Sequence, residues 1–284
     1  MKSFSLLVIL NFTFFVSFSQ TYSGQIIDTE SGKPIPYANI GIVGKNVGTA
    51  SDANGLFKIE LNSKFDQDTL GISCIGYMNR KYQIRNFKDN ILIADKAKIG
   101  LSPRIYQLPD VVIKPVKIKI YTLGNYCDPG SAYGNAFYSE QIGTEIGVII
   151  KLPRKKVQGY LQTFRFYVGE FTFEKFPVRL NIYNLKNNKP YENILTEPIY
   201  IEIKSEGEYI IDLKKYNIKL TDDFFISLEY YKIPDRNKGK LVFCATHRKN
   251  VNKGNGYFRF TSQGNWEPEP IDNVGFSVQI ECEK

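Results

Sequence analysis

The chain has 284 residues, which is long enough for two domains that each bury a hydrophobic core. Tyr and Phe supply most of its 14% aromatic residues, a composition that favours strands over helices. Its 37 basic and 29 acidic residues give a net charge of +8, which favours anionic partners, and its single histidine excludes zinc sites that need two.

A secretory signal peptide is predicted at residues 1–19. Lys2 supplies its positive start, and the apolar run 6–18 ends among the small serines that a signal peptidase requires. This run is shorter than the ~20 apolar residues of a membrane-spanning helix. The first cysteine is Cys74, too far along the chain for a lipid attachment site. We expect an exported mature chain that starts at Gln20 and has no transmembrane segment.

Residues 21–113 show short alternating apolar segments separated by turns, with no apolar period of helical length between them. This pattern is typical of a β-sandwich. Polar residues with glycine form the turns, most clearly at 28–32 and 52–55. The expected strands are 21–28, 38–43, 57–61, 70–74 and 111–113.

Ordered motifs mark this segment: Gly24-x-Ile-x-Asp28, Gly32-x-Pro34-Ile-x-x-Ala38, Gly44, Gly48-Thr49, Ser51-Asp52-x-x-Gly55-x-Phe57 and Ile72-Ser-x-Ile-Gly76-Tyr77. Their order resembles the carboxypeptidase regulatory-like domain, over about a third of the chain. The resemblance implies a seven-stranded, Greek-key, transthyretin-like sandwich that accompanies peptidases, outer-membrane receptors and surface proteins of Gram-negative bacteria. It also implies no catalytic residues in this domain and a location in the periplasm or on the outer-membrane surface.

The resemblance assigns turn-forming roles, and no ligand, to Gly32, Asp52, Gly55 and Gly76. A calcium loop around Asp52 is excluded by spacing. With Gly55 at position six of an EF-hand loop, Ala50 and Leu61 would take the first and last ligand positions.

A linker is expected at 114–119, and residues 120–284 again alternate between apolar and polar positions. They contain roughly nine predicted strands with turns near 187–190, 235–239, 252–256 and 262–265. A helix-poor segment of this length is most simply a larger, jelly-roll-like β-sandwich. It resembles the galactose-binding or jelly-roll modules of exported proteins, which implies glycan or protein binding.

The four cysteines show no C-x-x-C spacing, so a zinc knuckle and a thioredoxin-type motif are excluded. At most one disulfide can close among Cys127, Cys244 and Cys282, and Cys127 with Cys282 is the first pair to test, because both lie near the ends of the second domain. The sequence leaves open both the pairing and whether a disulfide forms. Cys74 alternates with apolar residues and is interpreted as a small buried hydrophobe.

His247 is the single histidine, so neither a metallocarboxypeptidase site nor a His-Glu-x-x-His site can form. A Ser-His-Asp or Cys-His site would have to use this same residue, which is interpreted as a surface histidine. No Gly-x-Ser-x-Gly elbow or phosphate-binding loop is present. We therefore expect no metal, no cofactor and no enzyme, although a glycosidase needs only two carboxylates.

Trp266 lies in a proline-held loop where its indole face could stack on a sugar ring, flanked by Tyr257 and Arg259 on the preceding strand. The alternative is that Trp266 has a structural role and packs over the end of the hydrophobic core of the sandwich. These three residues are the predicted ligand-binding set.

The leading hypothesis is an exported, non-catalytic binding or scaffold protein of the cell envelope, with a glycan or an envelope protein as partner. The alternatives are an accessory subunit of an outer-membrane receptor complex and a jelly-roll carbohydrate-active enzyme. Nucleic acid is not an expected partner, because the basic clusters at 114–119 and 151–156 are not interleaved with stacking aromatics.

Overall fold

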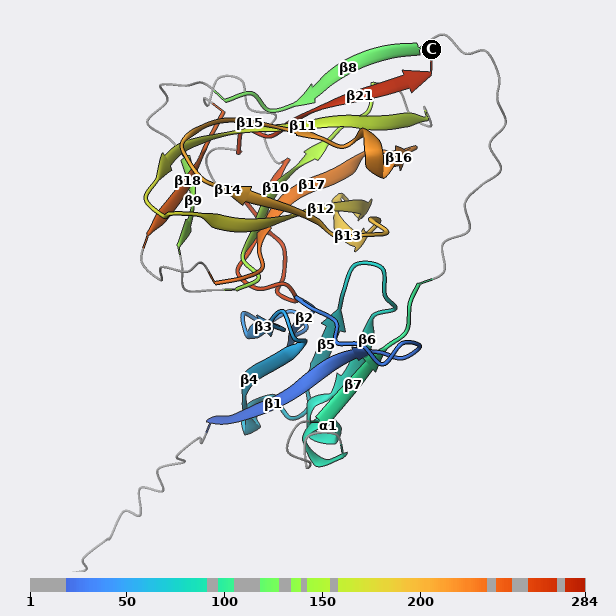
Figure 1. Ribbon diagram of the computed structural model, residues 1–284, viewed down its shortest axis with the longest axis vertical. Helices are drawn as coiled ribbons and strands as arrows, with labels where there is room; N and C mark the ends of the chain where they lie inside the picture. Colours follow the sequence, from blue (N-terminus) through green and yellow to red (C-terminus); the bar gives the residue numbers. More distant parts are fainter. Residues whose placement is uncertain are drawn as a thin grey trace, which may run out of the picture.

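The computed structural model describes residues 19–90, 97–104, 118–127, 134–138, 142–153, 158–233, 239–246, 255–269 and 274–283. Nearly all of the regular structure is β, in two domains that lie one above the other in Figure 1. Several sequence-based predictions fall outside the described residues: the signal peptide up to residue 18, the strand 111–113, the linker up to residue 117 and His247.

Within the described part of the first domain, seven strands form two sheets. Its three-stranded sheet has the order β4-β1-β7, and its four-stranded sheet has the order β3-β2-β5-β6. All of these pairs are antiparallel except β1 with β7. The strands are β1 (Ser19–Asp28), β2 (Asn39–Ile42), β3 (Gly48–Ala50), β4 (Leu56–Asn62), β5 (Thr69–Ser73), β6 (Arg80–Gln83) and β7 (Ala97–Leu101).

The core of this domain follows from the alternation in the sequence. On β4, Phe57, Ile59 and Leu61 are buried while their neighbours are exposed, because successive strand residues point to opposite faces. Several features differ from expectation. Helix α1 (Ile84–Asn90) follows β6 and buries Ile84 and Phe87, but its seven residues are too few to display a helical period. Strands β3, β6 and β7 were also not predicted.

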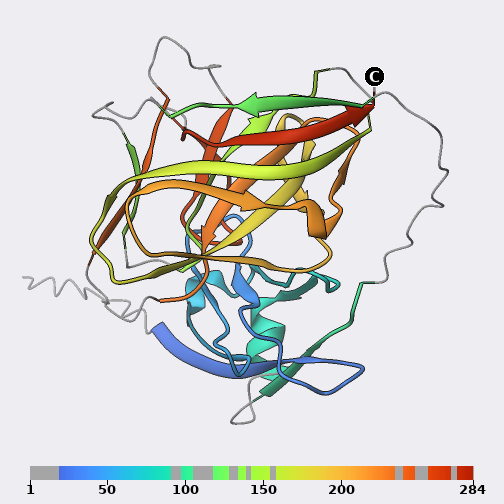
Figure 2. The same cartoon turned by 45° about the horizontal axis from the view of Figure 1, so that its top comes forward.

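The described strands of the second domain form a β-sandwich of two seven-stranded sheets, which lies above the first domain in Figure 1 and is turned forward in Figure 2. One sheet has the order β13-β12-β17-β10-β19-β20 with β14 beside β12; the other has the order β8-β21-β11-β18-β9 with β15 and β16 beside β11. Its strands are β8 (Ile118–Gly124), β9 (Gly134–Tyr138), β10 (Glu145–Ile150), β11 (Gly159–Phe171), β12 (Phe176–Lys186), β13 (Lys189–Asn193), β14 (Ile199–Ile203), β15 (Gly207–Asp212), β16 (Lys219–Leu220), β17 (Phe224–Tyr230), β18 (Lys240–Cys244), β19 (Gly256–Arg259), β20 (Glu267–Pro268) and β21 (Ser277–Glu283).

The sandwich class of this domain is confirmed, but it has more strands than the nine expected. The additional strands are β8, β9, β13, β16 and β20. The last two have only two residues each and carry no alternation to detect, whereas β8 has seven residues and includes the last two positions of the predicted linker. The inward residues of both sheets form one large hydrophobic core, separate from the core of the first domain.

The pairing of Cys127 with Cys282 is wrong: Cys127 is bonded to Cys244, and Cys282 is a free, buried cysteine. The reason is the antiparallel pairing of β8 with β21, in which Gly124 faces Ser277 and Lys119 faces Cys282. Cys127 follows the end of β8 that Ser277 contacts, so it lies at the opposite end of this strand pair from Cys282. Proximity to the ends of a domain in sequence did not mean proximity in space.

Cys74 carries the other free thiol and lies just after β5, where it is partly buried against the first-domain core rather than fully buried as expected. Burial raises the pKa of this thiol to about 11, so it stays protonated at neutral pH.

Candidate functional site

Four charged residues form a row across four neighbouring strands of the second domain, on the face that points away from its core. Arg179 of β12 faces Glu229 of β17, Glu229 faces Glu145 of β10, and Glu145 faces Arg259 of β19. We call these four residues the charge row. Alternation explains its position, because their neighbours in sequence point into the core. The row therefore has the charge order plus, minus, minus, plus.

All four members of the charge row are buried, with at most 8% of any residue exposed. Arg179 donates from Nε and Nη2 to Oε2 of Glu229 at 3.0 and 2.8 Å. Arg259 likewise donates from Nε to Oε2 of Glu145 at 2.9 Å, and from Nη2 to the same oxygen. Burial has the largest single effect on these arginines and disfavours the charged guanidinium. The facing carboxylate and other neighbouring groups together outweigh burial and raise the pKa of each arginine above its usual value.

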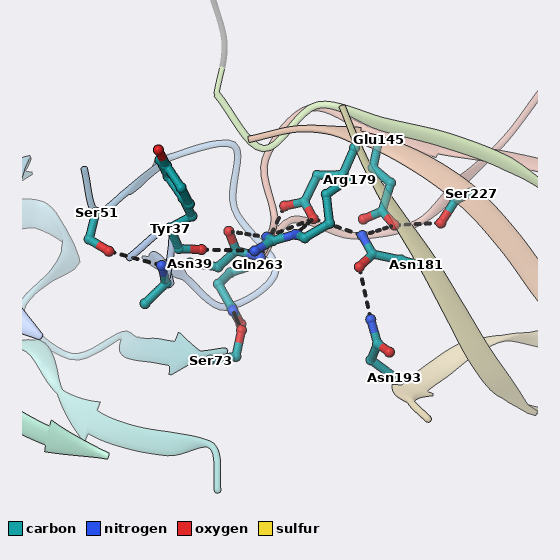
Figure 3. Close-up of polar contacts among 12 residues, drawn as sticks. Tyr37, Asn39, Ser51, Ser73, Glu145, Arg179, Asn181, Asn193, Ser227 and Gln263 are labelled. Carbon is teal, nitrogen blue, oxygen red and sulfur yellow. Dashed lines mark hydrogen bonds and ion pairs between the residues drawn. The ribbon is translucent and has the colours of Figure 1, made fainter. Parts of the chain in front are cut away.

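Neutral side chains separate the two glutamates, which would otherwise repel each other. Asn181 donates from Nδ2 to Glu145 at 2.9 Å and to Glu229 at 2.7 Å, and Ser227 donates to Glu145 at 2.5 Å. Asn193 in turn donates to Oδ1 of Asn181 at 2.9 Å. Figure 3 shows this chain of contacts running from the domain junction to β13. Buried charges are tolerated only when paired and hydrogen-bonded in this way.

The charge row also joins the two domains. Arg179 donates from Nη1 to the carbonyl oxygen of Tyr37 at 2.8 Å and from Nη2 to Oδ1 of Asn39 at 3.0 Å. Asn39 returns a hydrogen bond from Nδ2 to Glu229 at 3.0 Å. A second link is made by Gln263, which donates from Nε2 to Ser73 Oγ at 2.9 Å (Figure 3). First-domain strands are thus fixed to the outer face of a second-domain sheet.

A pocket of about 140 Å³ lies beside these links, between the two domains. Its lining is rich in amide side chains and includes parts of Arg179 and Arg259 from the charge row, but neither glutamate. Tyr191 is the most exposed of its aromatic residues, at 53%. The amide-bearing lining residues are Asn39, Asn79, Asn181, Asn193 and Gln263.

The structure brings the predicted ligand-binding residues together on the outer face of the same sheet. The Arg259 guanidinium lies 4.4 Å from the Trp266 ring centroid, and Trp266 makes edge contacts with Phe225 and Tyr183. Tyr257 is buried and donates to the carbonyl oxygen of Asn188 at 3.2 Å. Arg259 lines the pocket, whereas Trp266 and Tyr257 do not. Trp266 instead packs on a satellite apolar cluster.

The turn-forming residues occupy tight turns of the first domain. Gly32, Gly55 and Gly76 have φ values of 69°, 72° and 85°, which glycine adopts without strain. Asp52 accepts hydrogen bonds at Oδ1 from the backbone amides of Asn54 and Leu56, each at 2.8 Å.

Sequence reasoning identified Arg259 but missed the other three members of the charge row and the pocket residues Tyr191 and Asn193. The sequence does contain one sign of the charge row: polar residues such as Arg179 and Asn181 stand at alternate positions of strands that are otherwise apolar. It does not say which strands are neighbours.

Comparison with known protein families confirms the resemblance that the motifs of the first domain indicated. Residues 22–113 match the CarboxypepD_reg-like domain family, so this part of the chain is such a domain. No curated protein matches the chain. Among the described residues, no helix is long and apolar enough to cross a membrane, and no group of three or more metal-ligating side chains comes together.

Solved structures give distant similarities only. The clostridial cysteine protease Cwp84 after propeptide cleavage is 11% identical, with a TM-score of 0.40, over 84% of this chain and 52% of its own. The cysteine protease and lectin-like domains of Cwp84, a surface layer associated protein of Clostridium difficile, are 10% identical with a TM-score of 0.36, over 87% of this chain and 58% of their own. The chain thus spans little more than half the length of these structures.

Proposed function

We propose that the protein is an exported, non-catalytic binding or scaffold protein of the cell envelope, with its ligand site in the pocket between the two domains. The observation that carries this proposal is the junction itself. Arg179 and Asn39 fix one domain to the other through buried hydrogen bonds, and the pocket lined by both domains lies beside them. Ligand sites occur preferentially at such domain interfaces.

The disulfide supports export. Cys127 and Cys244 are joined across 117 residues, and disulfides of this kind form and persist in oxidising compartments outside the cytosol. The mature chain would keep 36 basic and 29 acidic residues, a net charge of +7, which suits an envelope rich in anionic groups.

The charge row supports a non-catalytic role over the carbohydrate-active enzyme. Glu145 and Glu229 are a close carboxylate pair of the kind that a glycosidase would use. Both are fully buried, each is held by an arginine, and neither lines the pocket. Their role is to join strands and domains.

A ligand screen on the purified mature chain tests this function. Envelope glycans and peptides would be screened by thermal shift, and each hit measured by calorimetry on the wild type and on an N79A/R104A pocket variant. We expect a ligand that the pocket variant loses and that the R165A variant, altered on an exposed surface pair, retains. Turnover of any glycan, or a hit that the pocket variant binds with unchanged affinity, would overturn the proposal.

A further inference from the structure

We infer that the pocket binds a neutral, polyhydroxylated ligand, the terminal sugar unit of a glycan. This inference rests on the proposed function, because it assumes that the pocket between the domains is the ligand site.

The balance of charge favours a neutral ligand. The charges of Arg179 and Arg259 are each compensated by a buried glutamate at hydrogen-bond distance. The remaining charged residues that line the pocket are Arg104 and Glu192, one of each sign. The charges that line the pocket or pair with its lining therefore sum to zero, because each charge-row arginine has its glutamate and Arg104 and Glu192 are opposite in sign. A carboxylate or phosphate would find no net positive charge to offset its loss of hydration. Hydroxyl groups do not carry this cost.

Several polar groups at the pocket have hydrogen-bonding capacity left over. Gln263 uses Nε2 for Ser73, while its Oε1 accepts from no described residue. Arg259 bonds through Nε and Nη2, and within the described part of the chain its Nη1 donates to nothing. A sugar hydroxyl both donates and accepts, so it can serve the amide oxygen and the guanidinium nitrogen.

Ser262 supplies an independent indication of a missing partner. It lines the pocket and is only 3% exposed, yet its hydroxyl has no hydrogen-bond partner among the described residues. An unsatisfied buried hydroxyl is unfavourable, and such groups in native structures call for a ligand or water to pair with them.

An aromatic ring and the pocket volume indicate a single sugar ring. Tyr191 lines the pocket with its side chain largely exposed, and an aromatic body with a polar tip suits a ligand that has both apolar and polar faces. The volume of about 140 Å³ is below the ~300–1,000 Å³ of sites for drug-sized molecules. One ring fits, with the rest of a glycan extending outward past Tyr191.

Calorimetry with defined small sugars tests the inference. The probes are methyl glycosides of glucose, galactose, mannose and N-acetylglucosamine, with glucuronic acid and inorganic phosphate as anionic comparisons. We expect at least one neutral glycoside to bind, with affinity about tenfold weaker for S262A and for Y191A. The matched control is Y126A, which removes a tyrosine of similar exposure, 54%, outside the pocket, and should bind as the wild type does.

Preferential binding of an anion, or neutral binding that Y191A and S262A leave unchanged, would overturn the inference. If no probe binds but the wider screen finds a ligand that N79A/R104A loses, this inference fails and the proposed function stands. If the wider screen also finds no ligand, the proposed function fails with it. If the thermal unfolding of Y191A is the same as that of the wild type, a loss of affinity in this variant cannot be explained by misfolding.

Discussion

Arg179 and Glu229 form a buried ion pair, with nitrogen–oxygen distances of 2.8 and 3.0 Å, that belongs to the second domain and also holds the first. Nη1 of the same guanidinium donates to the carbonyl oxygen of Tyr37, so the Arg179 side chain links two strands of the second domain and also binds the first domain. Breaking this pair should affect folding and domain docking together.

We predict that R179A lowers the free energy of unfolding by about 3–5 kcal/mol, because it leaves Glu229 buried beside Glu145 without its cation. R165A is the control: its pair with Glu208 is 3.3 Å long and about half exposed, so it should cost at most about 1 kcal/mol. Urea unfolding followed by tryptophan fluorescence measures both. Equal losses in the two variants would show that the charge row does not stabilise the fold.

We predict that loss of the disulfide lowers the free energy of unfolding by about 2–5 kcal/mol, because the bond closes a loop of 117 residues and restricts the unfolded chain. The C127S/C244S variant and the reduced wild type should agree. Thiol titration of the unfolded, unreduced protein should give two free thiols, from Cys74 and Cys282. A protein with Cys127 bonded to Cys282 would instead retain a free thiol at Cys244, which peptide mapping would reveal.

The sequence predicted strands where buried and exposed residues alternate clearly, and it missed β8, whose side chains are mostly exposed or half-buried. In β4, each buried residue is separated from the next by one exposed residue, so the pattern is local and complete. Helix α1 buries Ile84 and Phe87 within seven residues, which is less than a periodic signal requires.

The site could not be predicted in the same way, because it depends on strand order. Glu145, Arg179, Glu229 and Arg259 are separated by 30 to 114 positions, and only the order β12-β17-β10-β19 makes them neighbours. For Trp266 the sequence left two interpretations open, a sugar-stacking face and a structural role at the end of the sandwich, and its contact with Arg259 depends on how its loop folds back over β19. A local sequence pattern shows which residues share one face of a strand. Which strands lie side by side is determined by pairing between segments far apart in the sequence.

Alkaline pH should destabilise the protein through its buried tyrosines. Burial raises the pKa of Tyr230 to about 12, against about 10 for an unfolded tyrosine. The folded state therefore retains a proton that the unfolded state releases, so the stabilising contribution is complete below pH 10 and is lost as the pH rises towards 12. Urea unfolding between pH 8 and pH 11.5 should show a smaller loss in Y230F than in the wild type. Y126F, altered at an exposed tyrosine, should follow the wild type; identical curves for all three proteins would refute this assignment.

Gly76 tests how closely the domains fit. It adopts a φ of 85°, and a Cβ at this position would lie 2.9 Å from the carbonyl oxygen of Thr196 in the second domain. Gly32 is the matched control, since its φ is 69° but a Cβ there would meet nothing within 4 Å. Both alanine variants carry backbone strain of about 1–2 kcal/mol, and G76A adds a steric clash, for a total loss of about 2–4 kcal/mol in the free energy of unfolding. Urea unfolding measures the difference. Equal losses would mean that the first domain moves away from Thr196 at little cost, which would contradict a rigid junction and the fixed pocket beside it.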